Sequence, residues 1–159
     1  MGLSMVMSAE GFDAFFAEAE TPLRRALVAT YGPTIGRGAA VDALSWAWEH
    51  WDRLRHLDNP IGYLYRVGQT AATRSMRPLR VVPSEENGHP VDAGERTDLE
   101  HGLAGLSDQQ RAVVVMVHGY GISQRETADI LGISVSTARE HLARAMDRLR
   151  QHTEVHDAR

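Results

Sequence analysis

The chain of 159 residues contains no cysteine and no lysine, so the 17 residues counted as lysine or arginine are all arginines. The absence of cysteine excludes disulfide scaffolds, thiolate metal sites and cysteine nucleophiles. No apolar run approaches the roughly 18 residues that a membrane helix needs. The N-terminus lacks a basic stretch followed by a long apolar one, so no secretory signal is predicted and a cytoplasmic location is the simplest expectation.

The composition is that of an ordinary globular protein, with 43% hydrophobic and 24% charged residues. This apolar content is enough for a core and excludes disorder of the whole chain. The length fits one domain or two small ones.

The net charge of −4 argues against a nucleic-acid partner, but its distribution argues for one. Residues 66–80 carry four arginines and no acid, residues 81–100 carry six acids and one arginine, and residues 135–150 carry four arginines and two acids. Two basic segments around an acidic one predict two contact surfaces and a linker. Ordinary solvated helix faces would give the same pattern.

Apolar spacing predicts helices throughout, because no strand-like alternation extends beyond a few residues. A first helix is expected from Phe12, broken, kinked or restarted near Pro22, after a loose start over residues 1–9. Further helices are expected from Ala39, from Pro60 to about Met76, and again from near Asp98. The predicted fold is all-α, with two small helical bundles joined by a flexible linker. Their boundaries are 10–78 for the first bundle, 79–98 for the acidic linker and 99–152 for the second bundle.

Three capped helices are expected in the second bundle. Ser107 and Ser123 each stand three residues before a Gln or Glu, which is the capping-box spacing. A glycine-containing turn, residues 132–134, separates a short helix from a longer one. A short helix, such a turn and an arginine-bearing second helix are typical of a helix-turn-helix.

The polar side chains at the start of the last helix can read DNA from the major groove and hold phosphates at the helix N-terminus. The candidate DNA-binding residues are Ser134, Ser136, Thr137, Arg139, Glu140, His141 and Arg144. A three-helix bundle with a solvated face is the alternative.

The second half resembles region 4 of bacterial sigma factors of the extracytoplasmic-function group, which reads the −35 promoter element in that family. The resemblance lies in the segments Gly121-Ile-Ser123, Glu126-Thr-Ala128, Leu131-Gly-Ile-Ser134 and Arg144-Ala145. LuxR-type regulators share a similar helix-turn-helix, so this half alone leaves the class of protein open.

The first half resembles region 2 of the same family. The similarity lies in Trp48-Glu-His-Trp51 followed by Asn59-Pro-Ile-Gly-Tyr63-Leu-Tyr65-Arg66-Val-Gly68. In the family this region docks on the polymerase β′ clamp and captures the −10 element as a single strand. The resemblance assigns −10 DNA to Arg53, Arg55, His56, Asp58, Asn59, Arg66, Gln69, Thr70, Arg74 and Arg77, and core polymerase to Asp42, Trp46 and Glu49.

Two positions depart from the family's docking pattern, since Gly38 replaces an acid and Val41 replaces an amide, while Asp42 keeps its acidic character. Each lost group could have made a charge-assisted hydrogen bond worth about 1.5–3 kcal/mol. Thr70 also stands where the family often has asparagine.

The aromatic residues carry their own expectations. Trp46, Trp48 and Trp51 are expected mainly in the core, with Trp48 at the position of the family's usual tryptophan and Trp46 as the more exposed one. Tyr63 and Tyr65 cannot share a helix face, so one of them is expected in the core.

The leading prediction is a sigma factor that directs bacterial RNA polymerase to promoters. Its partners would be core polymerase (β′ clamp and β flap), promoter DNA and an anti-sigma factor, without membrane insertion. The alternative is a helix-turn-helix regulator with weak or no core binding. An enzyme is not expected, because the sequence has no H-E-x-x-H set, phosphate loop or nucleophile elbow. No cofactor or metal site is predicted.

Overall fold

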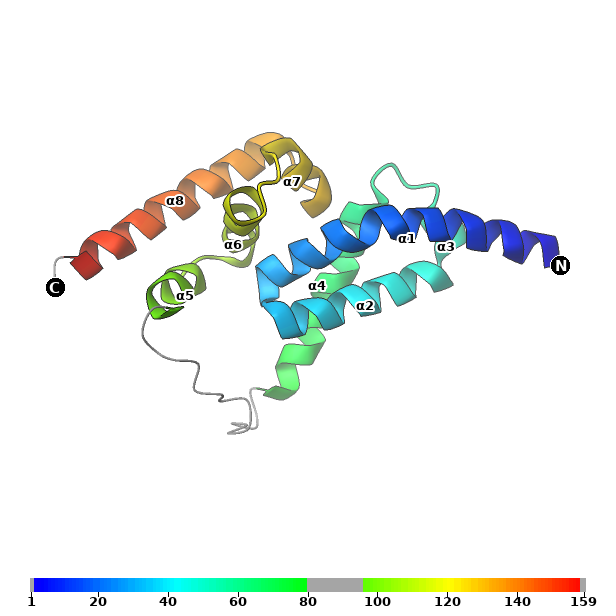
Figure 1. Cartoon of the computed structure of the whole chain (residues 1–159), viewed down its shortest axis with the longest axis horizontal. Coiled ribbons are helices and arrows are strands. Elements are labelled where there is room, and N and C mark those ends of the chain that lie inside the picture. The colour runs from blue at the N-terminus through cyan, green and yellow to red at the C-terminus, as the bar shows by residue number, and fades with distance from the viewer. Residues whose placement is uncertain (1, 80–95, 158–159) are drawn as a thin grey trace.

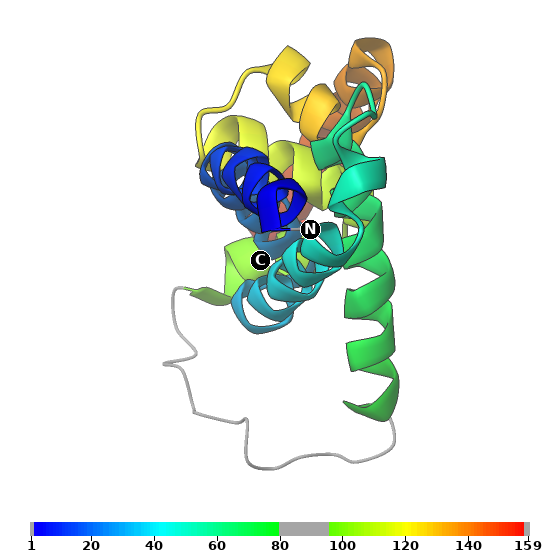
Figure 2. The same ribbon diagram turned by 90° about the vertical axis from the view of Figure 1, so that its right-hand side faces the viewer.

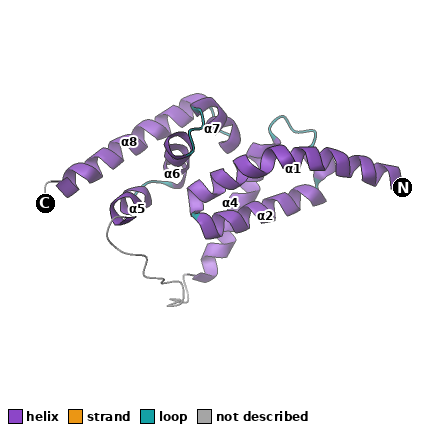
Figure 3. Cartoon of the chain, viewed as in Figure 1, coloured by secondary structure: helices purple, strands orange, loops and turns teal. Residues whose placement is uncertain are grey.

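The structure is a computed structural model that describes residues 2–79 and 96–157, and every regular element in these two ranges is a helix (Figure 3). The first range holds α1 (Gly2–Tyr31), α2 (Pro33–Glu49), α3 (Trp51–Leu54) and α4 (Pro60–Leu79). The second holds α5 (Arg96–Ala104), α6 (Asp108–Val114), a π-type turn η2 (Val115–Gly119), α7 (Gln124–Leu131) and α8 (Val135–Asp157). The all-α fold with a C-terminal helix-turn-helix is confirmed.

The pair α1 and α2 forms the body of the first half, with α4 packed across both (Figures 1 and 2). Small residues allow the two long helices to lie close together. A Cβ on Gly36 would lie 2.5 Å from the Cα of Val28, so only glycine fits at this crossing. Alanines of both helices are buried in the core, including Ala26, Ala39 and Ala43.

Helix α1 is longer and more continuous than the sequence indicated. It begins at Gly2, where a loose start was expected, and it runs through Pro22 without a break. Proline inside a helix costs about 3 kcal/mol. Burial of Ala19 before it and Leu23 and Leu27 after it, on the face that meets the rest of the core, offsets that cost.

The other helices of the first half also differ in length from their predictions. Helix α2 begins at Pro33 rather than at Ala39, because Gly32 with φ +89° turns the chain and proline suits the first helical position. Helix α4 begins at Pro60 as predicted and continues to Leu79. The side chain of Asn59 accepts the Gly62 N–H at 3.0 Å and so caps this helix.

A buried hydrogen bond joins α1 to α4. The hydroxyl groups of Thr30 and Tyr65 lie 2.7 Å apart, and Thr30 also donates to the carbonyl of Ala26. Burial raises the pKa of the Tyr65 phenol far above its ordinary value, so this group stays neutral. Tyr65 is therefore the core member of the tyrosine pair, and Tyr63 is the exposed one, as the helix geometry requires.

Local caps define the second half. Ser107 and Gln110 form the predicted reciprocal capping box at the start of α6. Ser123 accepts the backbone N–H of Glu126 at 3.1 Å and so caps α7. The chain segment 113–115, which is β-prone by composition, lies in α6 and the π-type turn, with Val113 and Val114 buried.

The two halves share one hydrophobic cluster. Helix α6 packs on α1, and α7 packs on α4. The guanidinium of Arg111 donates to the carbonyl of Thr30 at 2.7 Å and, within its own half, to the carbonyls of Leu103 and Leu106. An arginine of α6 thus satisfies a free carbonyl at the C-terminal end of α1. Of the predicted linker, Leu79 lies in α4 and residues 96–98 lie in α5, while residues 80–95 lie outside the described residues.

Candidate nucleic-acid interface and docking surfaces

The helix-turn-helix consists of α7, a turn at Gly132 and α8. Gly132 takes φ +71°, a left-handed conformation that glycine adopts without strain. It ends α7, and the next N–H, that of Ile133, returns to the carbonyl of Ala128 at 3.0 Å. Buried Ala138, Leu142 and Ala145 fix the inner face of α8, so its opposite face points outward.

Five of the seven predicted DNA-binding residues of this motif are exposed: Ser134, Ser136, Arg139, Glu140 and Arg144. Thr137 and His141 are half-buried, and the Nδ1 atom of His141 is buried without a hydrogen-bond partner. His141 therefore offers at most one edge of its ring to DNA, whereas the side chain of Arg139 lies in solvent.

Hydrogen bonds already hold several of these polar groups. The Ser134 hydroxyl caps α8 by accepting the Thr137 N–H at 3.1 Å, and it donates to the Thr137 hydroxyl at 2.7 Å. The Arg144 guanidinium pairs with the Glu140 carboxylate at 2.7 Å, and both side chains are about 60% exposed, at 63% and 59%. Such an exposed pair is weak and can exchange for DNA contacts.

The predicted −10 residues fall into two groups. Arg53, Arg55, His56, Asp58 and Asn59 are exposed on α3 and the loop that follows it. On α4, Arg66, Thr70 and Arg74 repeat at every fourth residue and therefore form one stripe. This stripe, with Gln69 and Tyr31, lines a hollow of about 510 Å³. The side chain of Arg77 lies outside the described residues.

The predicted polymerase-docking residues are separated by the structure. Asp42 and Trp46 line a hollow of about 420 Å³ with Tyr63, Thr70 and Arg74, which places them beside the α4 stripe. The Trp46 ring stacks on His50, with centroids 4.2 Å apart, and lies 5.4 Å from Tyr63. Glu49 instead borders a different surface, on the other side of α2.

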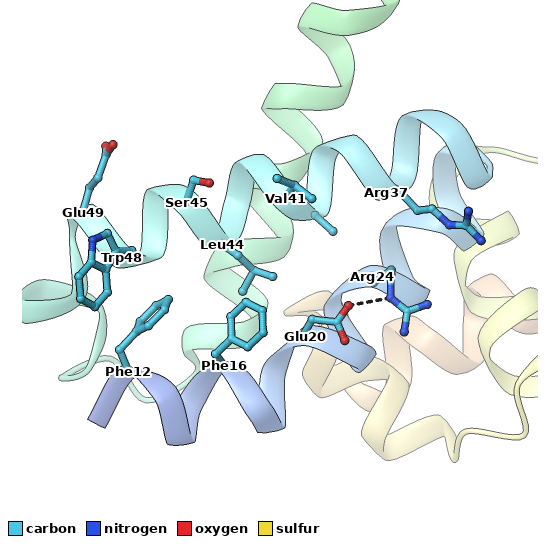
Figure 4. Close-up of a pocket in the computed structure, with 11 residues that line it drawn as sticks. Phe12, Phe16, Glu20, Arg24, Arg37, Val41, Leu44, Ser45, Trp48 and Glu49 are labelled. Atoms are coloured by element: carbon cyan, nitrogen blue, oxygen red, sulfur yellow. Dashed lines mark hydrogen bonds and ion pairs between the residues drawn. The ribbon is translucent and has the colours of Figure 1, made fainter. Parts of the chain in front are cut away.

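That other surface, here called the α1–α2 groove, is apolar and has a volume of about 730 Å³ (Figure 4). Its floor and walls come from Phe12 and Phe16 on α1 and from Val41, Leu44 and Trp48 on α2. The Glu20–Arg24 ion pair, at 2.8 Å, stands at one side, and its hydrogen bond lowers the pKa of Glu20.

The expectation for two tryptophans is wrong. Trp48 is 51% exposed, whereas Trp46 is half-buried by its aromatic neighbours. The cause lies in the tertiary structure, because the Trp48 ring packs against Phe12, with centroids 5.1 Å apart, and lines the open groove. Two apolar stripes in the sequence, 12/16 and 41/44/48, have the spacing that could have indicated the groove.

Within the described residues, no three His, Asp or Glu side chains are arranged to hold a metal ion. The same residues contain no helix of sufficient length and hydropathy to span a bilayer.

The helix-turn-helix with its exposed polar face, beside a helical half with an arginine stripe, defines a DNA-binding transcription protein. A family model described as "Sigma-70, region 4" matches residues 102–151. The RNA polymerase sigma-E factor of Streptomyces avermitilis is 31% identical over 148 residues, which cover 88% of this chain and 73% of that protein. That of Streptomyces coelicolor is 32% identical over 123 residues, or 72% of this chain and 70% of that one.

Solved structures have the same fold. The sigma factor RpoE of Bartonella quintana, in complex with the anti-sigma factor NepR, superposes with a TM-score of 0.59 at 22% identity, over 92% of this chain and 98% of that one. CnrH, in complex with the cytosolic domain of CnrY, gives a TM-score of 0.57 at 23% identity, over 94% of each chain. The chain belongs to the RNA polymerase sigma factor family, in its extracytoplasmic-function group.

Proposed function

We propose that this sigma factor docks on core RNA polymerase through α2, holds the −10 element with the α3–α4 segment, and reads the −35 element with α8. The alignment with the Streptomyces sigma-E factor carries this proposal, because its 148 residues run through both halves of the chain. A sigma factor directs polymerase to specific promoters and performs no chemical step itself, so no enzymatic activity is included. Its place of action is the cytoplasm, where polymerase and DNA are found.

The division of labour follows the chain. Residues 10–78 act as region 2 and residues 99–152 act as region 4, with residues 79–98 as the connection. Arginines of the α4 stripe supply the sequence-independent attraction to phosphates. Exposed Arg139 and Glu140 are the base readers of α8, because Arg donates to guanine and Glu accepts from cytosine.

Docking on core polymerase is the step that the sequence departures affect most. Gly38 and Val41 are both exposed on α2, and a side chain at Gly38 would meet nothing within 4 Å. These positions are therefore free to contact the β′ clamp but offer it no charge or amide. We also propose the β flap as the partner of the second half. An anti-sigma factor is a third partner, and the α1–α2 groove supports it as an apolar surface open to a protein helix.

The test is co-elution with bacterial core polymerase on a sizing column at moderate salt, followed by transcription from promoters selected from a random pool. A complex and promoter-specific transcripts are expected. Gly38→Asp with Val41→Gln should strengthen the complex by about tenfold or more. The same two changes on exposed positions of α8, Ala143→Asp with Val155→Gln, should leave it unchanged.

Failure to form a complex with either the native chain or the Gly38/Val41 variant would overturn the proposal. That result would favour a DNA-binding regulator built on a sigma scaffold.

A further inference from the structure

A predicted −10 residue is already engaged by the helix-turn-helix. The side-chain amide of Asn59 donates to the backbone carbonyl of Asp129 at 2.7 Å, although the two residues are 70 positions apart. Asp129 lies in the last turn of α7, and its carbonyl also accepts the Gly132 N–H at 3.2 Å, so Asn59 is a second donor to it. Asn59 thus caps α7 from the other half of the molecule while its oxygen caps α4.

Two glycines bring the backbones together at this point. A Cβ built on Gly62 would lie 3.2 Å from the Cα of Gly132, and one built on Gly132 would lie 3.6 Å from the Cα of Gly62. The first turn of α4 and the turn between α7 and α8 therefore meet with no side chain between them. A Cβ on Gly62 would be too close to its neighbours, whereas one on Gly132 would be in ordinary contact, so only a longer side chain at Gly132 would press on the other half.

Two further contacts hold the same arrangement. The Arg111 guanidinium donates to the Thr30 carbonyl, as described above. The Arg25 guanidinium lies 5.2 Å from the centre of the Tyr120 ring, in cation–π range. These contacts connect α1 to α6 and to the turn before α7. The two halves are therefore held together by several separate contacts.

We propose that the contact of Asn59 and Gly62 with Asp129 and Gly132 is an intramolecular clasp that keeps the free protein closed and withholds Asn59 from the −10 strand. The inference rests on the proposed function. The amide of Asn59 cannot donate the same hydrogen to a base while it caps α7. Promoter elements about two helical turns apart lie roughly 70 Å from each other, so both reading surfaces can engage them only after the clasp opens.

The experiment uses the absence of native cysteine in this chain. Ser75→Cys and Ala143→Cys place two spin labels at exposed positions of α4 and α8, one in each half and away from the clasp. Distances between the labels are measured in the full chain. Gly132→Asn opens the clasp, because asparagine tolerates the left-handed conformation but its side chain extends toward Gly62.

Gly121→Asn is the matched control. Gly121 is also left-handed, at φ +70°, yet a Cβ there meets nothing within 4 Å. Both variants carry the same backbone strain, and only one presses on the other half. A second opening variant, Gly62→Ala, acts from the α4 side, where its Cβ would lie 2.5 Å from the Asn59 amide nitrogen.

The native chain and Gly121→Asn should give one narrow distance distribution, with the open form below roughly 10%. Gly132→Asn should make the open form the majority, and Gly62→Ala should move in the same direction. A broad distribution in the native chain, or no change in Gly132→Asn, would overturn the clasp. Adding core polymerase should lengthen the distance in the native chain, and binding without lengthening would also overturn it. A failure to bind polymerase would count against the proposed function alone, because the free-protein distances test the clasp by themselves.

Discussion

The two halves of this sigma factor are held together by different means. In the first half, α1 and α2 lie close because Gly36 has no side chain and lies against the backbone of Val28. In the second half, short helices are fixed by serine caps and a left-handed glycine. The first half depends on the absence of a side chain at Gly36, where α1 and α2 cross. The second half depends on capping and turn residues within a few positions of each helix end.

This difference explains why local sequence patterns predict the second half better than the first. Caps and turns act locally, so the position of the helix-turn-helix could be predicted from a few residues. A crossing between long helices depends on partners far apart in the chain, so residues such as Gly36 carry no local sign of their role. Substitutions in each half should reveal which kind of constraint is stronger.

The largest effect is expected from Gly36→Ala. Its Cβ would lie 2.5 Å from the Cα of Val28, a backbone atom that cannot move without separating α1 from α2. Overpacking of this kind costs about 3 kcal/mol. Urea unfolding monitored by tryptophan fluorescence measures it. The control is Gly38→Ala on the same helix, which meets nothing and should stabilise the chain by up to about 1 kcal/mol. Equal effects of the two changes would contradict the close-packed crossing.

Next in size is the loss of a base contact in the second half. Arg139→Ala should cost about 1–3 kcal/mol in binding and relax the preference at one −35 position. Arg74→Ala on the α4 stripe should instead weaken binding to all sequences and lower the salt slope by about 1. Binding titrations on a selected promoter and its single-base variants, at several salt concentrations, separate the two. Identical behaviour would show that the assignment of base and phosphate readers is wrong.

A helix cap in the second half should matter somewhat less. Ser107→Ala removes one partner of the capping box at α6 and should cost about 1 kcal/mol. The exposed Ser75 of α4, which caps no helix end, is the control, and Ser75→Ala should change stability by less than about 0.5 kcal/mol. Thermal unfolding gives both values. If both changes cost the same, caps would not be what distinguishes the second half.

The smallest effect is expected at the edge of the α1–α2 groove, where Glu20 pairs with Arg24 at 2.8 Å. The hydrogen bond lowers the pKa of Glu20 in the folded chain. The contribution of the ion pair to the free energy of unfolding is therefore complete above the ordinary pKa of glutamate. It is lost as the pH falls through the lowered pKa of Glu20. Glu20→Gln should reduce Tm by no more than about 2 °C near neutral pH, and the difference should vanish in acid. Melting curves across that range check it, and a difference that persists in acid would have another cause.

Much of the fold and part of the candidate site could be predicted from residues alone. The helices that start near Pro60 and Ser123, the turn at Gly132 and the burial of one of the two tyrosines follow from caps, periodicity and glycine, which act over a few positions. The continuity of α1 through Pro22 could not be predicted, because burial against distant residues outweighs the cost of a proline. The same holds for Trp46 and Trp48, whose exposures depend on which helix lies opposite.

The sequence by itself determined the helical class, the helix-turn-helix and the membership of the sigma family, since periodicity, caps and motif order are properties of neighbouring residues. Only the tertiary structure decided that Asp42 and Trp46 lie beside the α4 stripe, and that Phe12 and Trp48 line an open groove. It also decided that Asn59 meets Asp129 across 70 positions. These arrangements depend on how the helices and the two halves pack. Packing depends on contacts between residues far apart in the chain, which local sequence patterns do not predict.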